Sequence, residues 1–182
     1  RHLELSLQGS GRAYEPGDAL GIRHRNPDPL VDAVLAATKL DGDALVARDG
    51  ESLALAEWLR DKRELSRIGR PLLASVAERG AHAELARLLE AQDKSGLAAV
   101  FDTHQLIDVL RRWPAGWDAD ALVAALRPQA QRLYSIASSR KRVGEEAHLT
   151  VDALRYQAHG FEHVGAASGF LASLEEGASL PV

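Results

Sequence analysis

The sequence predicts an α+β fold in which a β domain is interrupted by a helical insertion. Alternating apolar and polar residues open the chain, and strand-like patterns return after Pro128. Between them, residues 27–127 are rich in alanine, leucine, arginine and glutamate, with apolar residues three and four positions apart. Because both ends are β and the middle is helical, we expect the two ends to form one domain around the insertion.

The first β unit is expected over residues 2–22. Residues 2–8, HLELSLQ, alternate as in a half-buried strand. The run Gly9-Ser10-Gly11 turns the chain, and the pair Pro16-Gly17 is typical of a tight turn. Residues 19–22, ALGI, then predict a returning strand.

The insertion is expected to be all-helical. Apolar residues recur at helical spacing over six stretches: 29–35, 52–59, 72–78, 83–90, 104–112 and 119–126. Pro71, Pro114 and Pro128 separate them, because proline fits the first turn of a helix or blocks the residues beyond its end.

Strand patterns return in the last third of the chain. They cover residues 132–137 and 148–156, with the charged residues 140–142 between them. Residues 170–174 predict a short helix, and Ser168 is the expected N-cap because its hydroxyl can accept a hydrogen bond from the first turn.

Composition indicates an ordinary folded protein. Of 182 residues, 46% are hydrophobic and 26% are charged, and the formal net charge is -4. Acids and bases are interleaved, which argues against a nucleic-acid surface or a polybasic membrane anchor. No apolar run approaches the roughly 20 residues of a membrane span, so no membrane contact is expected from this segment.

Cysteine and methionine are both absent. The lack of cysteine excludes disulfides, thiolate metal sites and cysteine nucleophiles, and it is compatible with a cytoplasmic location, which we expect. The lack of methionine indicates that Arg1 is not a natural start, so the chain is expected to be a segment of a longer protein.

The stretch RLYSIASS, residues 132–139, is the first candidate binding site. On a strand, Arg132 and Tyr134 lie on one face, where a guanidinium and an aromatic ring can reach the same ligand. Arginine suits a phosphate, tyrosine suits a flat heterocycle, and the Ser135 hydroxyl can bond a ring heteroatom. An ordinary edge strand with a surface arginine is the alternative, and these residues alone favour neither.

The stretch Gly165-Ala166-Ala167-Ser168 is the second candidate. Small residues before a helix let an anion approach the exposed backbone N–H groups, where the helix dipole also favours negative charge. The alternative is a loop followed by a capped helix.

Residues 159–163, HGFEH, match the H-x-x-E-H zinc signature by letter. That chemistry needs both histidines on one helical face and a further ligand. Gly160 and the strand pattern ending at Tyr156 predict a hairpin loop instead, so no metal site is expected.

Taken in order, these stretches resemble the flavin-binding module of the ferredoxin-NADP reductase superfamily. The matching segments are YEPGDALGI (14–22), RLYSIASS (132–139), HLTVDALRY (148–156) and GAASGFLAS (165–173). The insertion resembles the connecting domain of diflavin reductases, and RHLELSL and LRPQAQRLYSIASS look most like the sulfite reductase flavoprotein branch. The resemblance covers nearly the whole chain and implies an antiparallel Greek-key β-barrel that binds FAD.

The resemblance also implies roles for individual residues. In the family's R-x-Y-S motif the arginine binds the FAD pyrophosphate, the tyrosine packs against the flavin and the serine hydroxyl lies near the redox-active N5. These roles fall on Arg132, Tyr134 and Ser135, with Ser135 as the implied catalytic residue and Leu133 contributing backbone.

Two further family segments have counterparts here. The segment whose backbone touches the isoalloxazine edge, and the tyrosine after it, match Thr150, Val151, Asp152 and Tyr156. The pyrophosphate loop matches Gly165, Ala166, Ala167 and Ser168.

Three departures from the family pattern stand out. Asp152 replaces the usual glycine and brings a carboxylate to the expected flavin edge, where it would disfavour an anionic reduced cofactor. His163 stands where the family often has a basic residue. The chain ends at Val182, where the last barrel strand would run, and it includes neither the FMN domain nor the NADPH domain.

We therefore expect residues 1–26 and 128–182 to form a C-terminally truncated FAD-binding barrel and residues 27–127 a connecting domain. The parent enzyme would carry electrons from NADPH through FAD to FMN and on to a hemoprotein acceptor. The chain by itself would hold FAD but not turn over NADPH. The alternative is a degenerate, non-catalytic interaction module of the same fold without flavin.

Overall fold

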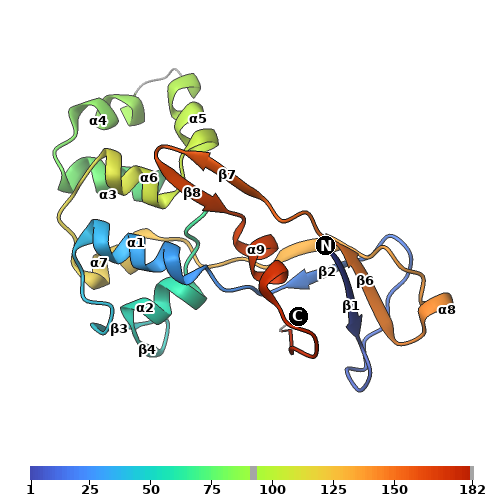
Figure 1. Ribbon diagram of the computed structural model, residues 1–182. Helices are drawn as coiled ribbons and strands as arrows, with labels where there is room; N and C mark the ends of the chain where they lie inside the picture. Colours follow the sequence, from blue (N-terminus) through green and yellow to red (C-terminus); the bar gives the residue numbers. More distant parts are fainter. Residues whose placement is uncertain (91–93, 181–182) are drawn as a thin grey trace. The chain divides into compact units, whose positions relative to one another are not determined.

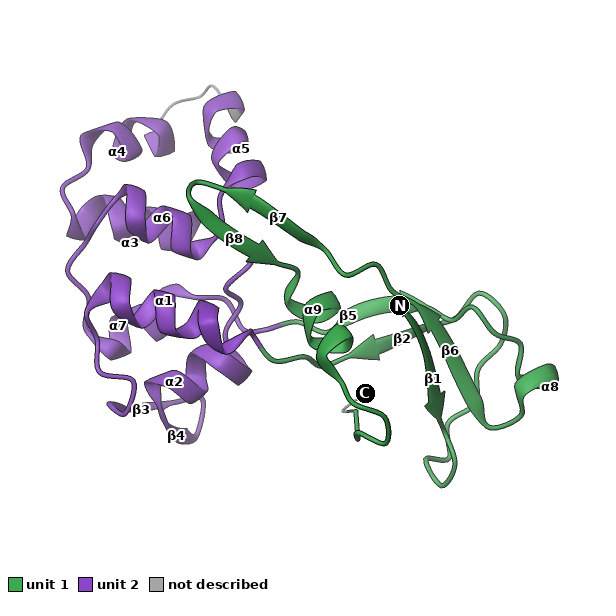
Figure 2. Ribbon diagram, in the orientation of Figure 1, with its two compact units in different colours: residues 1–25, 130–182 green, residues 26–129 purple. Residues whose placement is uncertain are grey.

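The computed structural model describes residues 1–90 and 94–180 and divides the chain into two compact units (Figure 1). Unit 1 comprises residues 1–25 and 130–182, and unit 2 comprises residues 26–129 (Figure 2). Both units mix helices with short strands, and every strand pair is antiparallel. The fold is therefore α+β.

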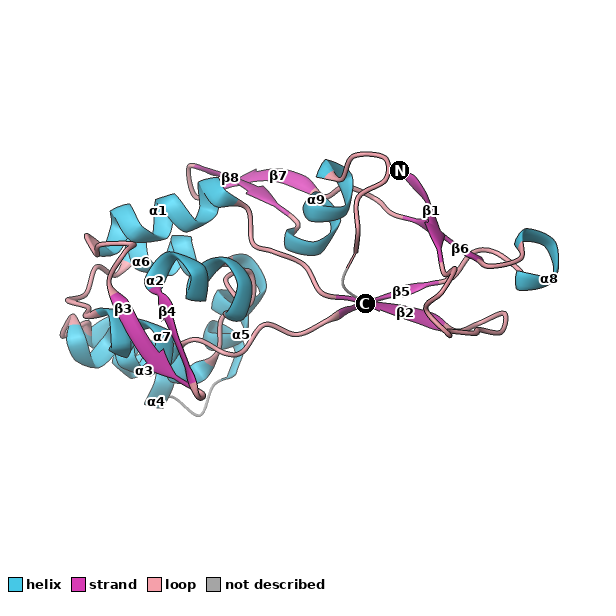
Figure 3. Cartoon of the chain, turned by 90° about the horizontal axis from the view of Figure 1, so that it is seen from below, coloured by secondary structure: helices cyan, strands magenta, loops and turns pink. Residues whose placement is uncertain are grey.

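The described residues of unit 1 contain three two-stranded sheets (Figure 3), and an isolated bridge between Ile136 and Leu149 links the chain after β5 to β6. The pairs are β1 (His2–Ser6) with β6 (Glu146–Thr150), β2 (Ala19–Ile22) with β5 (Arg132–Ser135), and β7 (Arg155–Ala158) with β8 (Phe161–Val164). Within the described residues none of these sheets closes on itself by hydrogen bonds. The expected Greek-key closure is thus not observed in the strand pairing.

The alternation of buried and exposed side chains fixes the register of the β1–β6 pair. Leu3 on β1 and Ala147 and Leu149 on β6 are buried, whereas His2 and Glu4 on the other face of β1 are exposed. A shift of one residue would expose the apolar face and bury the charged one, so burial selects the observed pairing.

One hydrophobic cluster joins strands β1, β2, β5 and β6 to helix α9 (Ala166–Ser173). Its buried members are Leu3, Leu7, Tyr14, Ile22, Ile136, Ala147, Leu149, Val151 and Leu171. The Tyr14 hydroxyl satisfies its polar end by donating to the Glu146 carbonyl at 2.8 Å and by bonding Ser138 Oγ at 2.6 Å. The tyrosine therefore packs its ring in the core without leaving a buried hydroxyl unpaired.

Two short helices complete unit 1. These are α8 (Arg140–Val143) after β5 and α9 (Ala166–Ser173) after β8. Helix α9 begins four residues earlier than expected, with Gly165 at its N-cap, so the prediction of Ser168 as N-cap is wrong. Ser168 lies in the first turn instead, and its hydroxyl has a different partner.

Unit 2 is mainly helical. Its elements are α1 (Asp28–Thr38), β3 (Leu45–Arg48), β4 (Glu51–Ala54), α2 (Leu55–Glu57), a π-helical turn η1 (Trp58–Lys62), α3 (Arg70–Arg79), α4 (Ala83–Glu90), α5 (Lys94–Thr103), α6 (Leu106–Arg112) and α7 (Ala119–Ala125). Local chemistry sets several ends: Pro29 and Pro71 lie in the first turns of α1 and α3, and Asp118 caps α7 by accepting from Ala121 N–H at 2.8 Å.

The expectation that the insertion is all-helical is wrong at residues 45–54. Strands β3 and β4 form a hairpin there, and only Leu55–Glu57 and the π turn follow as helix where a helix over 52–59 was predicted. Asp49 and Gly50 at the turn both have positive φ, 54° and 80°, which Asp-Gly pairs adopt in two-residue hairpins. That pair was the local signal for the hairpin. Helix α5 was also not anticipated.

The prediction of one strand over 148–156 is also wrong. Strand β6 ends at Thr150, residues 151–154 are irregular, and β7 begins at Arg155. The break occurs because Val151 is drawn into the core while Asp152 is exposed, and the backbone of Leu154 then bonds to the start of α9.

Among the helices of the described residues, none is both long and apolar enough to cross a lipid bilayer.

Candidate functional site

Strand β5 carries the Arg-Leu-Tyr-Ser stretch. Paired with β2, it alternates in burial: Arg132 and Tyr134 are half-buried on one face, while Leu133, 72% exposed, and Ser135 lie on the other. The period of two therefore places the guanidinium and the phenol together, as predicted for a strand, and sends the Ser135 hydroxyl to the opposite face.

Arg132 and Tyr134 also interact electrostatically. Partial burial raises the pKa of the Tyr134 phenol above its ordinary value, and the charge of Arg132 opposes that rise. The Tyr134 ring packs against the hydrophobic cluster of unit 1. The phenol is consequently held neutral beside a fixed positive charge.

The Thr150-Val151-Asp152 segment is divided between core and solvent. Val151 is 2% exposed and belongs to the hydrophobic cluster, and its backbone exchanges hydrogen bonds with Arg1, from Val151 N–H to Arg1 O at 2.8 Å and from Arg1 N to Val151 O at 2.6 Å. Thr150 and Asp152 are exposed. Thr150 and Asp152, rather than Val151, therefore offer groups to a ligand.

The Gly165-to-Ser168 loop folds tightly against Leu154. Gly165 N–H donates to the Leu154 carbonyl at 2.9 Å, and Ser168 Oγ accepts from Leu154 N–H at 3.3 Å. A Cβ at Gly165 would collide with Ser168 Oγ in its present position, so glycine favours this approach. Ala166 and Ala167 are buried, and the N-terminus of α9 has no side-chain cap.

These contacts bring together stretches that are far apart in the sequence. Leu154 joins the segment after β6 to the start of α9. Ile136 after β5, Val151 after β6 and Leu171 in α9 then meet in one cluster. The three candidate stretches thus share one core.

Tyr156 lies on the β7–β8 hairpin. The residue is 40% exposed, and its ring stacks on that of His163, its cross-strand partner, with ring centroids 5.0 Å apart and planes at 19°. His163 itself is 1% exposed. Stacking and strand pairing therefore hold the Tyr156 ring in a fixed orientation.

The β7–β8 hairpin also contains residues 159–163, which match the H-x-x-E-H zinc signature by letter. His159 lies in the turn, with φ of 51°, and His163 lies on β8, so the two histidines do not share a helical face. The prediction of a hairpin is confirmed.

Two features escaped the sequence analysis. A cavity of about 230 Å³ is lined by residues that include Tyr14, Leu20 and Ile136. None of its lining residues was given an individual role, although Ile136 lies in the RLYSIASS stretch. The side chains of His2, Glu4 and His148 also meet on the β1–β6 pair. Both features depend on pairing between distant strands, which no local pattern reveals.

Comparison with known proteins gives homologues along the whole chain. The chain is 43% identical over 183 residues to the sulfite reductase (NADPH) flavoprotein alpha-component of Vibrio cholerae serotype O1, covering 100% of the chain and 30% of that protein. It is 41% identical over 186 residues to the protein of the same name in Shewanella oneidensis, again covering 100% and 30%. The counterpart in Yersinia enterocolitica is 41% identical over 172 residues, covering 94% and 28%.

The chain thus spans about 30% of the length of the relatives it matches. No family model matches it.

Proposed function

Because the whole chain resembles one segment of these flavoproteins, we propose that it is the FAD-binding portion of an NADPH-dependent diflavin reductase of the sulfite reductase type. Residues 1–26 and 128–182 would form the flavin domain, a Greek-key barrel in the complete protein, and residues 27–127 the connecting domain. The FMN domain, the NADPH domain and a hemoprotein acceptor would be partners in the parent enzyme.

The observation that carries the proposal is the shared core of the three candidate stretches. Ile136, Val151 and Leu171 pack together, which draws Arg132, the segment after β6 and the N-terminus of α9 into one unit. A large cofactor with a pyrophosphate and a ring system needs such separated contacts held by a common scaffold.

The groups present fit FAD. Arg132 supplies a guanidinium for the pyrophosphate, and the uncapped N-terminus of α9 supplies backbone N–H groups for the same anion. Gly165 lacks the Cβ that would fill the space beside Ser168, which favours a close approach of backbone to ligand. Tyr134 and Tyr156 supply aromatic surface, and the exposed residues Thr150 and Asp152 are available to the ring edge.

The protein's task in this proposal is to bind and orient the cofactor. FAD, when bound, would supply the redox chemistry of hydride acceptance from NADPH and single-electron transfer to FMN. The Ser135 hydroxyl would hydrogen-bond near N5, and Leu133 would contribute backbone. Neutral Tyr134 would pack against the flavin without adding a charge beside Arg132.

A second candidate is a non-catalytic interaction module of the same fold. Asp152 is exposed and would bring a negative charge to the flavin edge, and His163 is buried, so it offers no basic group to a phosphate. The backbone of Val151 also favours this second candidate, since its N–H and carbonyl are already hydrogen-bonded to Arg1.

Flavin retention separates the two candidates. The chain is mixed with FAD, freed of excess, and its visible absorption recorded beside Arg132→Ala, with Arg142→Ala on exposed helix α8 as the matched control. We expect the chain and Arg142→Ala to retain FAD and Arg132→Ala to lose it. The assignment would be overturned by a folded chain that retains no FAD, or by an Arg132→Ala variant that retains as much FAD as the unsubstituted chain.

A further inference from the structure

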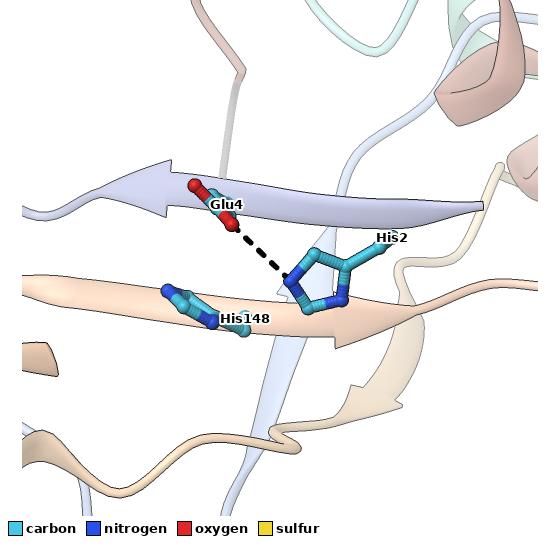
Figure 4. Close-up of side chains that lie close together, drawn as sticks. All are labelled: His2, Glu4 and His148. Atoms are coloured by element: carbon cyan, nitrogen blue, oxygen red, sulfur yellow. Dashed lines mark ion pairs between the residues drawn. The ribbon is translucent and has the colours of Figure 1, made fainter. Parts of the chain in front are cut away.

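The exposed face of the β1–β6 pair carries a cluster of metal-binding side chains. His2 and Glu4 come from β1 and His148 from the neighbouring β6 (Figure 4). One potential ligand atom from each lies within 4.8 Å of the other two. From this geometry we propose that His2, Glu4 and His148 bind a divalent transition-metal ion, with Zn²⁺ as the probe.

Strand register holds the cluster together. Glu4 pairs directly with His148, and His2 is two residues from Glu4 on the same face. The opposite face, with Leu3, Ala147 and Leu149, is buried in the core, so the register cannot slip without exposing it. The backbone that presents the three side chains is therefore fixed by packing rather than by the side chains themselves.

The donor set is that of an open zinc site. Two imidazoles and one carboxylate are a common set of three protein ligands, which leaves a fourth position for water. Ligand bonds of 2.0–2.1 Å place the ligand atoms of a tetrahedral site about 3.3 Å apart. His2 Nε2 lies 3.5 Å from Glu4 Oε1, close to this spacing, and all three ligand atoms lie within 4.8 Å of one another, so side-chain rotation must still draw them together around an ion.

A fourth side chain supports His148. Glu146 Oε2 lies 3.0 Å from His148 Nε2, on the same strand two residues away. A carboxylate bonded to a metal-binding histidine typically fixes the orientation of its ring. With Glu4, Glu146 also gives this face two carboxylates, which favours a cation.

Access to the cluster is open. The side chains of His2 and Glu4 are 53% and 64% exposed, and those of His148 and Glu146 are 18% and 47% exposed. An ion can thus reach the site from solvent without opening the core. Because its ligands come from two strands, a bound ion would clamp β1 to β6 and stabilise unit 1.

Calorimetric titration with Zn²⁺ tests the proposal on the chain without added flavin. We expect one Zn²⁺ per chain, a rise in melting temperature that a chelator reverses, and loss of more than about tenfold in affinity in His2→Ala and in His148→Ala. The His2 side chain is 53% exposed, so its replacement should leave the core of unit 1 intact. Glu4→Gln, which keeps shape but removes charge, is expected to weaken binding as well.

His159→Asn is the matched control, because it removes a histidine of the same unit that lies in the β7–β8 turn, and asparagine tolerates the positive φ there. This variant should bind Zn²⁺ with the same affinity as the unsubstituted chain. NMR should show the ring resonances of His2 and His148 shifting together on titration. Equal Zn²⁺ affinity in His2→Ala, His148→Ala and the parent, or the same loss in His159→Asn, would overturn the proposal.

Discussion

Ser168 and Leu154 are joined by a hydrogen bond in which the Ser168 hydroxyl accepts from the Leu154 backbone N–H at 3.3 Å. Beside it, Gly165 N–H donates to the Leu154 carbonyl at 2.9 Å. Both polar groups of one exposed backbone unit are thus satisfied by the first turn of α9 and its cap. Two hydrogen bonds therefore join the loop after β6 to the proposed pyrophosphate site.

Replacing Ser168 by alanine should loosen this loop. A single hydrogen bond to a partly exposed amide contributes about 1 kcal/mol to stability, so hydrogen exchange at the Leu154 amide should speed up roughly fivefold. FAD retention should fall with it. Ser173→Ala is the control, since its hydroxyl donates to Phe170 O at the other end of the same helix. Unchanged exchange at Leu154 would show that the hydroxyl does not hold the loop.

The titration of Tyr134 should report the charge of Arg132. Burial raises the pKa of the phenol above its ordinary 10.0, so the folded chain keeps a proton that the unfolded chain loses. The free energy of unfolding should therefore be level below about pH 10 and fall as the pH rises through that value.

Phenolate absorbance follows this titration, and Tyr134→Phe identifies which of the three tyrosines is responsible. Arg132→Ala removes the opposing charge, so the pKa of Tyr134 should rise further, while Arg142→Ala should leave it unchanged. A fall in the pKa of Tyr134 in Arg132→Ala would contradict the proposed pairing.

Gly169→Ala should destabilise unit 1 although alanine is the better helix former. A Cβ at Gly169 would collide with Cγ1 of Val164, a stiff β-branched side chain. Overpacking of this kind costs about 1–3 kcal/mol, which exceeds the roughly 1 kcal/mol gained in helix propensity. Thermal unfolding followed by circular dichroism measures the difference.

Gly96→Ala in α5 is the matched change. Its Cβ would meet only the tip of the flexible Leu88 side chain, at 2.9 Å, so helix propensity should prevail and the melting temperature should hold or rise. Equal effects of the two substitutions would mean that Val164 yields more easily than its branching suggests.

Arg63→Lys should destabilise unit 2. The Arg63 guanidinium is 5% exposed, donates to Val123 O at 3.1 Å, pairs with Asp49 Oδ2 at 2.8 Å and lies 4.6 Å from the centre of the Trp58 ring. A lysine cannot make these contacts together, so we expect a loss of about 2 kcal/mol in the free energy of unfolding.

Denaturant unfolding followed by tryptophan fluorescence checks this, because Trp58, Trp113 and Trp117 all lie in unit 2. Arg60→Lys is the control: its pair with Asp28 at 2.7 Å is more exposed and should change stability by no more than about 0.5 kcal/mol. A similar loss in the free energy of unfolding in both variants would show that the buried guanidinium of Arg63 contributes no more than the exposed one of Arg60.

Much of the fold could be predicted from local patterns. The strand at residues 19–22 and the helices near 72–78, 83–90 and 119–126 are confirmed, because an amphipathic period is set by each segment's own residues. The β3–β4 hairpin was not predicted because residues 52–59, which overlap β4, have helical spacing. The Asp49-Gly50 pair is the local turn signal that would have indicated the hairpin.

The placement of side chains on β5 was predicted for the same reason. A period of two is enough to place Arg132 and Tyr134 on one face of β5. It cannot reveal that Val151 is buried with its backbone bonded to Arg1, since that depends on a strand at the other end of the sequence.

The sequence by itself determined which segments are amphipathic, where turns interrupt them, and which side chains of one strand share a face. Only the tertiary structure decided that Ser168 bonds Leu154 instead of capping a helix, and that His148 lies opposite Glu4. The physical reason is the range of the interactions: periodicity and turn chemistry act between near neighbours, whereas strand register and loop contacts follow from burying one common core.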